Sequence, residues 1–152
     1  MAHTDAEARQ ELLGAVADAI DDIGIALAAL GAAYEQLDER NADRLEEELF
    51  GPVQHAYGRA KRAHTEFAGR HGLATRRFET PSPGVPSTGA KGFIDSAVSA
   101  AARADAALAT LQDSLMPVEV GDTELRSALT EVRALLGDVP RRARELERTL
   151  GR

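Results

Sequence analysis

The sequence predicts a single all-α domain spanning residues 1–152, folded as an antiparallel four-helix bundle with up-down-up-down topology. Apolar residues recur at alternating spacings of three and four through four separate segments, which gives each helix one apolar face. Polar or proline-rich stretches separate these segments. The chain is long enough to bury a core of its own, so the absence of cysteine does not count against a stable fold.

The first helix is expected over residues 5–37. Thr4 and Glu7 match a capping box, in which each side chain bonds a free backbone amide at the helix start. The apolar face then comprises Leu13, Val16, Ile20, Ile23, Leu27, Leu30, Tyr34 and Leu37. A helix of this length is unstable alone and requires partner helices.

The second helix is expected in two parts, over residues 41–50 and 52–72, broken at Gly51-Pro52. Proline cannot donate its amide hydrogen, and it disfavours helical geometry in the residue before it. The apolar face of the second part comprises Val53, Tyr57, Ala60, His64, Phe67 and His71.

A long proline-rich loop is expected over residues 74–90, because three prolines and two glycines exclude a helix there. Loops of this length inside compact domains are usually functional or disordered. The third helix follows over residues 91–116, with an alanine-rich apolar face. The fourth is expected over residues 123–150, capped by Asp122 and bent near Pro140.

Formal charge alternates in sign along the chain. Residues 1–51 and 92–122 are acidic overall, whereas residues 52–91 and 123–152 are basic overall. In an up-down-up-down bundle this order places unlike charges on neighbouring helices, and it disfavours contact between the first and third helices. Each exposed ion pair contributes only ~0.2 to 1 kcal/mol.

The composition also limits the function. The net charge of −7 argues against a dedicated nucleic-acid binder, so no nucleic-acid partner is expected. We expect no membrane span, because acidic residues interrupt the most apolar segment. The first residues do not resemble a secretory signal, and a cytoplasmic location is the expectation.

Basic residues are expected to gather at one end of the bundle, where the second and fourth helices would end together. This pole would comprise Arg70, Arg76, Arg77, Lys91, Arg144, Arg148 and Arg152. Basic side chains near helix ends often only complement the helix dipole in solvent. The functional alternative is a site for an anion or an acidic partner.

Histidines offer a metal-binding alternative. His64 and His71 lie seven residues apart on one helix face, and His3 is expected at the same pole. Imidazole with carboxylates can bind zinc or iron. A ferritin-like di-iron site is excluded because the chain has no Glu-x-x-His motif.

The segment from Ala63 to Gly69 resembles the histidine segment of His-containing phosphotransfer domains, which are also four-helix bundles. The resemblance implies a phosphate acceptor at His64. The lysine that follows the histidine in that family is absent here, and His64 lies on the predicted buried face. Phosphotransfer is therefore not the function that we expect.

A strip of small residues lies beside the apolar face of the first helix and comprises Ala17, Gly24 and Gly31. Glycine inside a helix costs about 1 kcal/mol relative to alanine, so close packing against the alanines of the third helix is one explanation. Docking of a partner helix or of a second copy is another. A gap in this packing, near Ala97, Ala101 and Ala104, would instead create a small-ligand site.

The sequence therefore favours a non-catalytic scaffold or protein-interaction module that binds a protein partner or forms a homo-oligomer, with no cofactor. Metal binding at His64, His71 and His3 and small-ligand binding between the first and third helices are the alternatives.

Overall fold

The computed structural model describes residues 2–150, except for the side chains of residues 2–4 and 87. Regular structure in this part is helical throughout, which confirms the all-α fold class. The long helices are α1 (Ala2–Glu35), α3 (Gly51–His71), α4 (Gly89–Asp113), α6 (Thr123–Gly137) and α7 (Val139–Leu150). Short elements are α2 (Glu39–Leu45), the π-helix η1 (Glu46–Phe50), the 3₁₀-helix η2 (Pro86–Thr88) and α5 (Met116–Glu119). None of the helices in residues 2–150 combines the length and the apolar character needed to cross a membrane.

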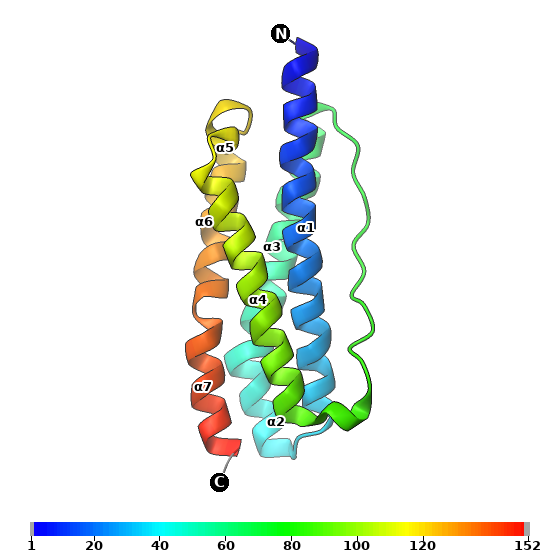
Figure 1. Cartoon of the computed structure of the whole chain (residues 1–152), viewed down its shortest axis with the longest axis vertical. Helices are drawn as coiled ribbons and strands as arrows, with labels where there is room; N and C mark the ends of the chain where they lie inside the picture. Colours follow the sequence, from blue (N-terminus) through cyan, green and yellow to red (C-terminus); the bar gives the residue numbers. More distant parts are fainter. Residues whose placement is uncertain (1, 151–152) are drawn as a thin grey trace.

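The helices pack side by side along the long axis of the molecule (Figure 1). α1 packs most extensively along α4, and α3 packs along α6. Weaker contacts join α1 to α3 and α4 to α6. In Figure 1, α1 and α6 run downward while α3 and α4 run upward, so the helices of each contacting pair are antiparallel. The core between them includes Ile20, Ile23, Phe67, Phe93 and Leu125, all essentially inaccessible to solvent.

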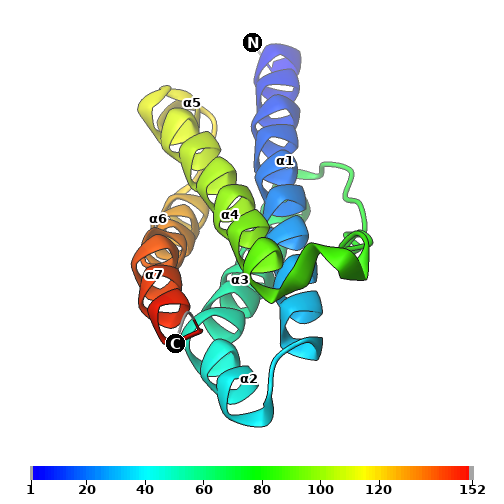
Figure 2. The same ribbon diagram turned by 60° about the horizontal axis from the view of Figure 1, so that its bottom comes forward.

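The predicted up-down-up-down topology is wrong, because α1 and α4, the first and third predicted helices, form the largest helix contact. Residues 73–85, which we call the crossover segment, have no regular secondary structure and return along the whole molecule before α4 begins (Figures 1 and 2). Roughly 13 extended residues span about 43 Å, enough to match the length of α4. α3 and α4 therefore run in the same direction.

Buried alanines explain why α1 and α4 pack together although both are acidic overall. Ala26, Ala29 and Ala33 are buried on the face of α1 that also carries Asp22, which pairs with Arg103 of α4 at 3.6 Å. α4 has small buried residues of its own at Ala97, Ala101 and Ala104. Small residues let two helix backbones approach closely. Burial at this contact outweighs the weak preference that exposed charges gave for another topology.

The predicted break at Gly51-Pro52 is also wrong, since the chain stays helical from Glu39 to His71. The amide of Gly51 bonds the carbonyl oxygen of Glu46, five residues back, and Phe50 and Gly51 keep right-handed helical angles. A π-turn of this kind inserts an extra residue into the helix. The backbone thereby accommodates Pro52 without ending the helix.

The fourth predicted helix is interrupted where the sequence predicts a bend. α6 ends at Gly137, and α7 begins at Val139, directly before Pro140. The apolar face continues on both sides, because Leu136, Val139 and Ala143 are all buried.

Candidate functional site: the basic groove beside the crossover segment

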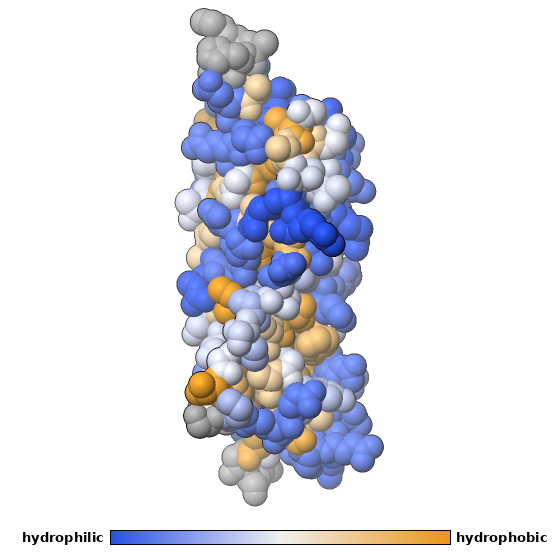
Figure 3. Space-filling view, turned by 90° about the vertical axis from the view of Figure 1, so that its right-hand side faces the viewer, coloured by the Kyte–Doolittle hydropathy of each residue, from blue (hydrophilic) through white to orange (hydrophobic). Residues whose placement is uncertain are grey.

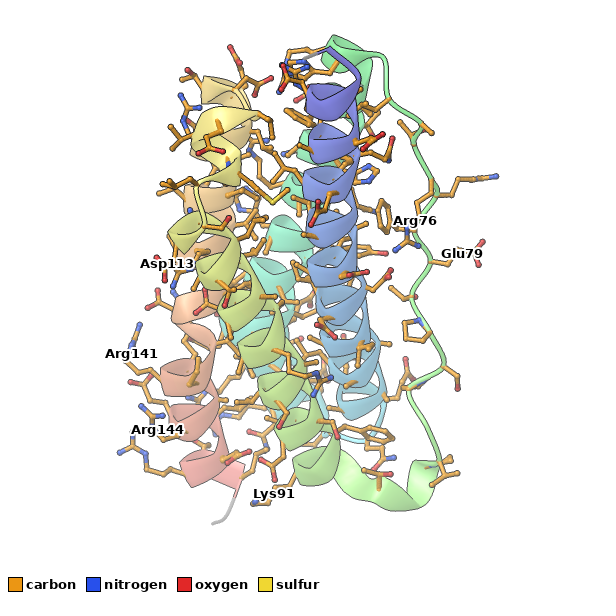
Figure 4. All side chains as sticks on the ribbon, turned by 45° about the horizontal axis from the view of Figure 1, so that its top comes forward. Arg76, Glu79, Lys91, Asp113, Arg141 and Arg144 are labelled. Atoms are coloured by element: carbon orange, nitrogen blue, oxygen red, sulfur yellow. The ribbon has the colours of Figure 1, made fainter. Side chains whose placement is uncertain are left out.

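The structure does not assemble the predicted basic pole. Arg70, at the end of α3, is engaged by Asp122, and Lys91 pairs with Asp95 near the opposite end of the molecule. Arg144 and Arg148 lie exposed on α7, away from the crossover segment. Figure 4 shows Arg144 pointing to solvent from α7, whereas Arg76 points from the crossover segment toward α1. Arg152 lies outside the described residues.

Arg76 and Arg77 instead meet basic residues of α3. A groove of about 660 Å³ lies between α3 and the crossover segment. Its walls, which define the basic groove, are Lys61, Arg62, Thr65 and Glu66 from α3 and Thr75, Arg76, Arg77 and Phe78 from the crossover segment. In the view of the crossover face in Figure 3, strongly hydrophilic residues gather across the middle of the surface.

The crossover segment is extended, and the alternating direction of its side chains determines where Arg76, Arg77 and Phe78 lie. Successive side chains in an extended chain point to opposite sides. Arg76 pairs with Asp21 of α1 and lies over the ring of Phe78, 4.3 Å from its centroid. Phe78 contacts the imidazole of His64 edge-on, with ring centroids 5.0 Å apart. Arg77, between them in sequence, is exposed.

The basic side chains of the groove differ in whether they contact a partner group. Lys61 lies over the ring of Tyr57, with its ammonium 4.1 Å from the centroid. Within residues 2–150, neither Arg62 nor Arg77 forms an ion pair or hydrogen bond. Glu66 is the one carboxylate among the groove-lining residues. The groove therefore presents unneutralised positive charge.

A second hollow, of about 390 Å³, lies on the other side of Arg76, between α1 and the crossover segment. We call it the inner hollow; its walls include Gln10, Leu13, Ala17, Asp18, Asp21, His64, Thr75 and Arg76. His64 is only 2% exposed, and its Nδ1 atom has no hydrogen-bond partner. Burial, together with the nearby charge of Arg76, lowers the pKa of His64.

No family model, curated protein or solved structure matches this chain.

The histidines do not form a metal centre in the described part of the chain. His71 donates a hydrogen bond through Nε2 to the carboxylate of Asp122 at 2.9 Å, whereas His64 packs beneath Phe78. The side chain of His3 lies outside the described residues. No group of three or more histidine, cysteine or carboxylate side chains able to hold a metal ion occurs among the described side chains.

The small-residue strip of α1 faces α3 and the crossover segment. A Cβ atom on Gly24 would lie 3.4 Å from the ring of Tyr57 in α3. Gly24 therefore packs toward α3, and the expected packing against the alanines of α4 is not found at this residue. The carbonyl oxygen of Ala17 accepts a long hydrogen bond from Arg76 at 3.5 Å. Gly31 has open space beside it. The hollow between α1 and α4 lies elsewhere, beside Ile25 and Ser96.

Sequence reasoning identified Arg76 and Arg77 but missed Lys61, Arg62 and Thr65. These three residues lie on α3 outside its predicted apolar face, where charged side chains are normally solvated. The adjacent pair Lys61-Arg62 was the available signal. Only the path of the crossover segment shows that this pair faces the two arginines.

Proposed function

We propose that this chain is a non-catalytic interaction module whose basic groove binds an acidic segment of a partner protein. An antiparallel four-helix bundle with one long crossover connection would serve as its rigid support. One observation carries the proposal: the groove gathers Lys61, Arg62 and Arg77 without an acidic partner for either arginine.

Unlike Arg62 and Arg77, arginines that lie between the helices form ion pairs. Ion pairs with carboxylates involve the helix arginines Arg59, Arg70, Arg103, Arg133 and Arg142. The chain carries 25 acidic and 18 basic residues, so carboxylates are not scarce. Positive charge left unpaired in a groove is complementary to an acidic ligand, and it favours encounter with one.

The chemistry of the groove suits binding better than catalysis. Lysine and arginine remain charged near neutral pH, where they act as hydrogen-bond donors and not as general bases. The hydroxyl groups of Thr65 and Thr75 add donors of moderate strength. The groove therefore offers charge and hydrogen bonds for recognition.

The test measures binding of a fluorescently labelled oligoglutamate peptide by anisotropy. We expect binding that weakens as salt concentration rises, because the contacts are exposed charge pairs. The double variant Arg62→Glu/Arg77→Glu should bind about tenfold more weakly or worse. The matched control is Arg144→Glu/Arg148→Glu, which changes the net charge equally on α7 and should leave binding within about twofold.

Two results would contradict the proposal. One is an absence of peptide binding by the parent protein at low salt. The other is an equal loss of affinity in the two double variants, since that would reflect net charge and not the groove. Sedimentation of each protein identifies self-association, which would make a second copy the acidic partner if the groove variant alone abolished it.

A further inference from the structure

Among the described residues, His64 is the single polar side chain classed as buried, and its surroundings leave one ring nitrogen without a hydrogen-bond partner. It is 2% exposed in the middle of α3, and its Nδ1 atom lacks a hydrogen-bond partner. The ring of Phe78 covers it edge-on at 5.0 Å between centroids. A neutral imidazole tolerates such a site far better than an imidazolium, which needs acceptors for both ring N–H groups.

Few contacts hold the middle of the crossover segment in place. Phe78 is partly buried against the core, and Arg76 contacts Asp21 and the ring of Phe78. Residues 79–86 are exposed, and the next tertiary hydrogen bond runs from Gln36 Nε2 to the carbonyl oxygen of Pro86 at 2.7 Å. Segments with so few buried contacts open at low cost in free energy.

The charged groups around His64 come from two elements packed against α3. Arg76 faces it from the crossover segment, and Asp18 and Asp21 line the same hollow from α1. Asp21 is already neutralised by Arg76. Burial and the charge of Arg76 disfavour the protonated imidazole, so both act in the same direction.

We propose that the crossover segment is a proton-controlled strap, seated over His64 at neutral pH and released in mildly acidic solution when that imidazole takes up a proton. The driving force is the cost of a buried cation beside Arg76. Departure of Phe78 admits water to His64 and removes that cost.

The direction of the pH dependence follows from the pKa of His64. The pKa is lowered in the seated state and returns toward its ordinary value near ~6.5 when the strap is released. Above that pH both states hold a neutral imidazole, and seating carries no penalty. As pH falls below it, the released state binds a proton that the seated state does not, and release becomes favoured.

Release would also alter the basic groove. Thr75, Arg76, Arg77 and Phe78 form its wall on the strap side. A released strap takes this wall away, so an acidic ligand should dissociate in mild acid. This consequence rests on the proposed function, whereas the release itself does not.

The chain contains no tryptophan, so Phe78→Trp introduces a single fluorescent probe under the strap. Emission should move to longer wavelength as pH falls below about 6.5, while far-ultraviolet circular dichroism stays unchanged. His64→Leu in the same background should abolish the shift. The matched control is His55→Gln, which removes an exposed histidine of the same helix and should preserve it.

A shift that persists in His64→Leu, or an absent shift in the Phe78→Trp parent, would overturn the strap. His64→Gln provides a second non-titrating variant if the leucine disturbs packing. Imidazole resonances in the unsubstituted protein should show His64 titrating below the ordinary histidine pKa of ~6.5. These readouts use no ligand, so failure of the strap leaves peptide binding at neutral pH intact, and failure of peptide binding leaves the strap intact.

Discussion

Arg70 and Asp122 form a bidentate ion pair that ties the last turn of α3 to the first turn of α6. Arg70 Nε lies 2.7 Å from Oδ2 of Asp122, and Nη2 lies 2.9 Å from Oδ1. The same carboxylate caps α6 by accepting the amide of Leu125 at 2.8 Å, and it contacts His71 Nε2 at 2.9 Å. One side chain therefore serves both a helix cap and a helix–helix contact.

Asp122 should make a distinct contribution to acid stability. Burial alone would raise its pKa, but the bonds from Arg70, Leu125 and His71 prevail and lower it from 3.8 to about 2. A carboxyl group with a lowered folded pKa stabilises the fold above its unfolded pKa, and that contribution is lost as pH falls toward the folded value. Asp122→Asn should therefore lower the free energy of unfolding at neutral pH by roughly 1 to 2 kcal/mol.

Urea unfolding from neutral pH down to about pH 2 measures this effect. Asparagine is still a good N-cap, so the variant isolates the charge. Asp113→Asn, at the exposed end of α4, is the matched control and should stay within about 0.5 kcal/mol of the parent. Identical acid dependence in Asp122→Asn and the parent would show that Asp122 does not hold its charge as described.

Arg142 of α7 should stabilise the π-turn of the second helix. Its Nη1 atom approaches both the carbonyl oxygen of Glu48, at 3.5 Å, and Oε2 of the same residue, at 3.4 Å. Pro52, four residues beyond Glu48, has no amide hydrogen to donate to that carbonyl. Arg142→Met should therefore lower the free energy of unfolding by about 1 kcal/mol. Arg144→Met, exposed on the same helix, should change it by less than about 0.5 kcal/mol, and thermal denaturation would distinguish them.

Gly24 and Gly31 of α1 should differ in how much side-chain volume they tolerate, because only Gly24 lies against another side chain. Nothing lies within 4 Å of a Cβ atom placed on Gly31, so Gly31→Ala should raise the free energy of unfolding by roughly 0.5 to 1 kcal/mol. Gly24 faces the ring of Tyr57, and Gly24→Leu should lower it by about 1 to 3 kcal/mol through overpacking. If Gly24→Leu matched Gly31→Leu in melting temperature, close packing at Tyr57 would be refuted.

The contact between α1 and α4 is open to a direct test because the chain lacks cysteine. Asp22 and Arg103 lie opposite each other across this contact. Asp22→Cys/Arg103→Cys should cross-link within one chain with a short bismaleimide. Asp22→Cys/Glu131→Cys is the control, since Glu131 of α6 pairs with Arg59 of α3 and should not cross-link to α1. A reversed pattern would restore the up-down-up-down arrangement.

The sequence located the helices well because each apolar face repeats with helical spacing, a local signal. It also identified His64 as a residue of a buried face. Topology was predicted wrongly because the argument used exposed charges, whose pair energies are small. The decisive contact is between alanine-rich faces of α1 and α4. An alanine side chain has no charge or hydrogen-bonding group, so the sequence does not indicate which helix it packs against.

The candidate site was predictable only in part. Arg76 and Arg77 were predicted as part of a basic pole because they directly follow the end of the second predicted helix. Their counterparts Lys61 and Arg62 became recognisable once the crossover segment was seen to run beside α3. Arg144 and Arg148 were grouped with them because the assumed topology placed the ends of both helices at one pole.

The two ends of the described chain leave the molecule in opposite directions (Figure 1). α1 begins at the top of that view, and α7 finishes at the bottom. With 34 residues rising 1.5 Å each, α1 alone measures about 50 Å. Bodies joined to these two ends would be held apart by roughly that distance, and helix length rather than linker flexibility would set their separation.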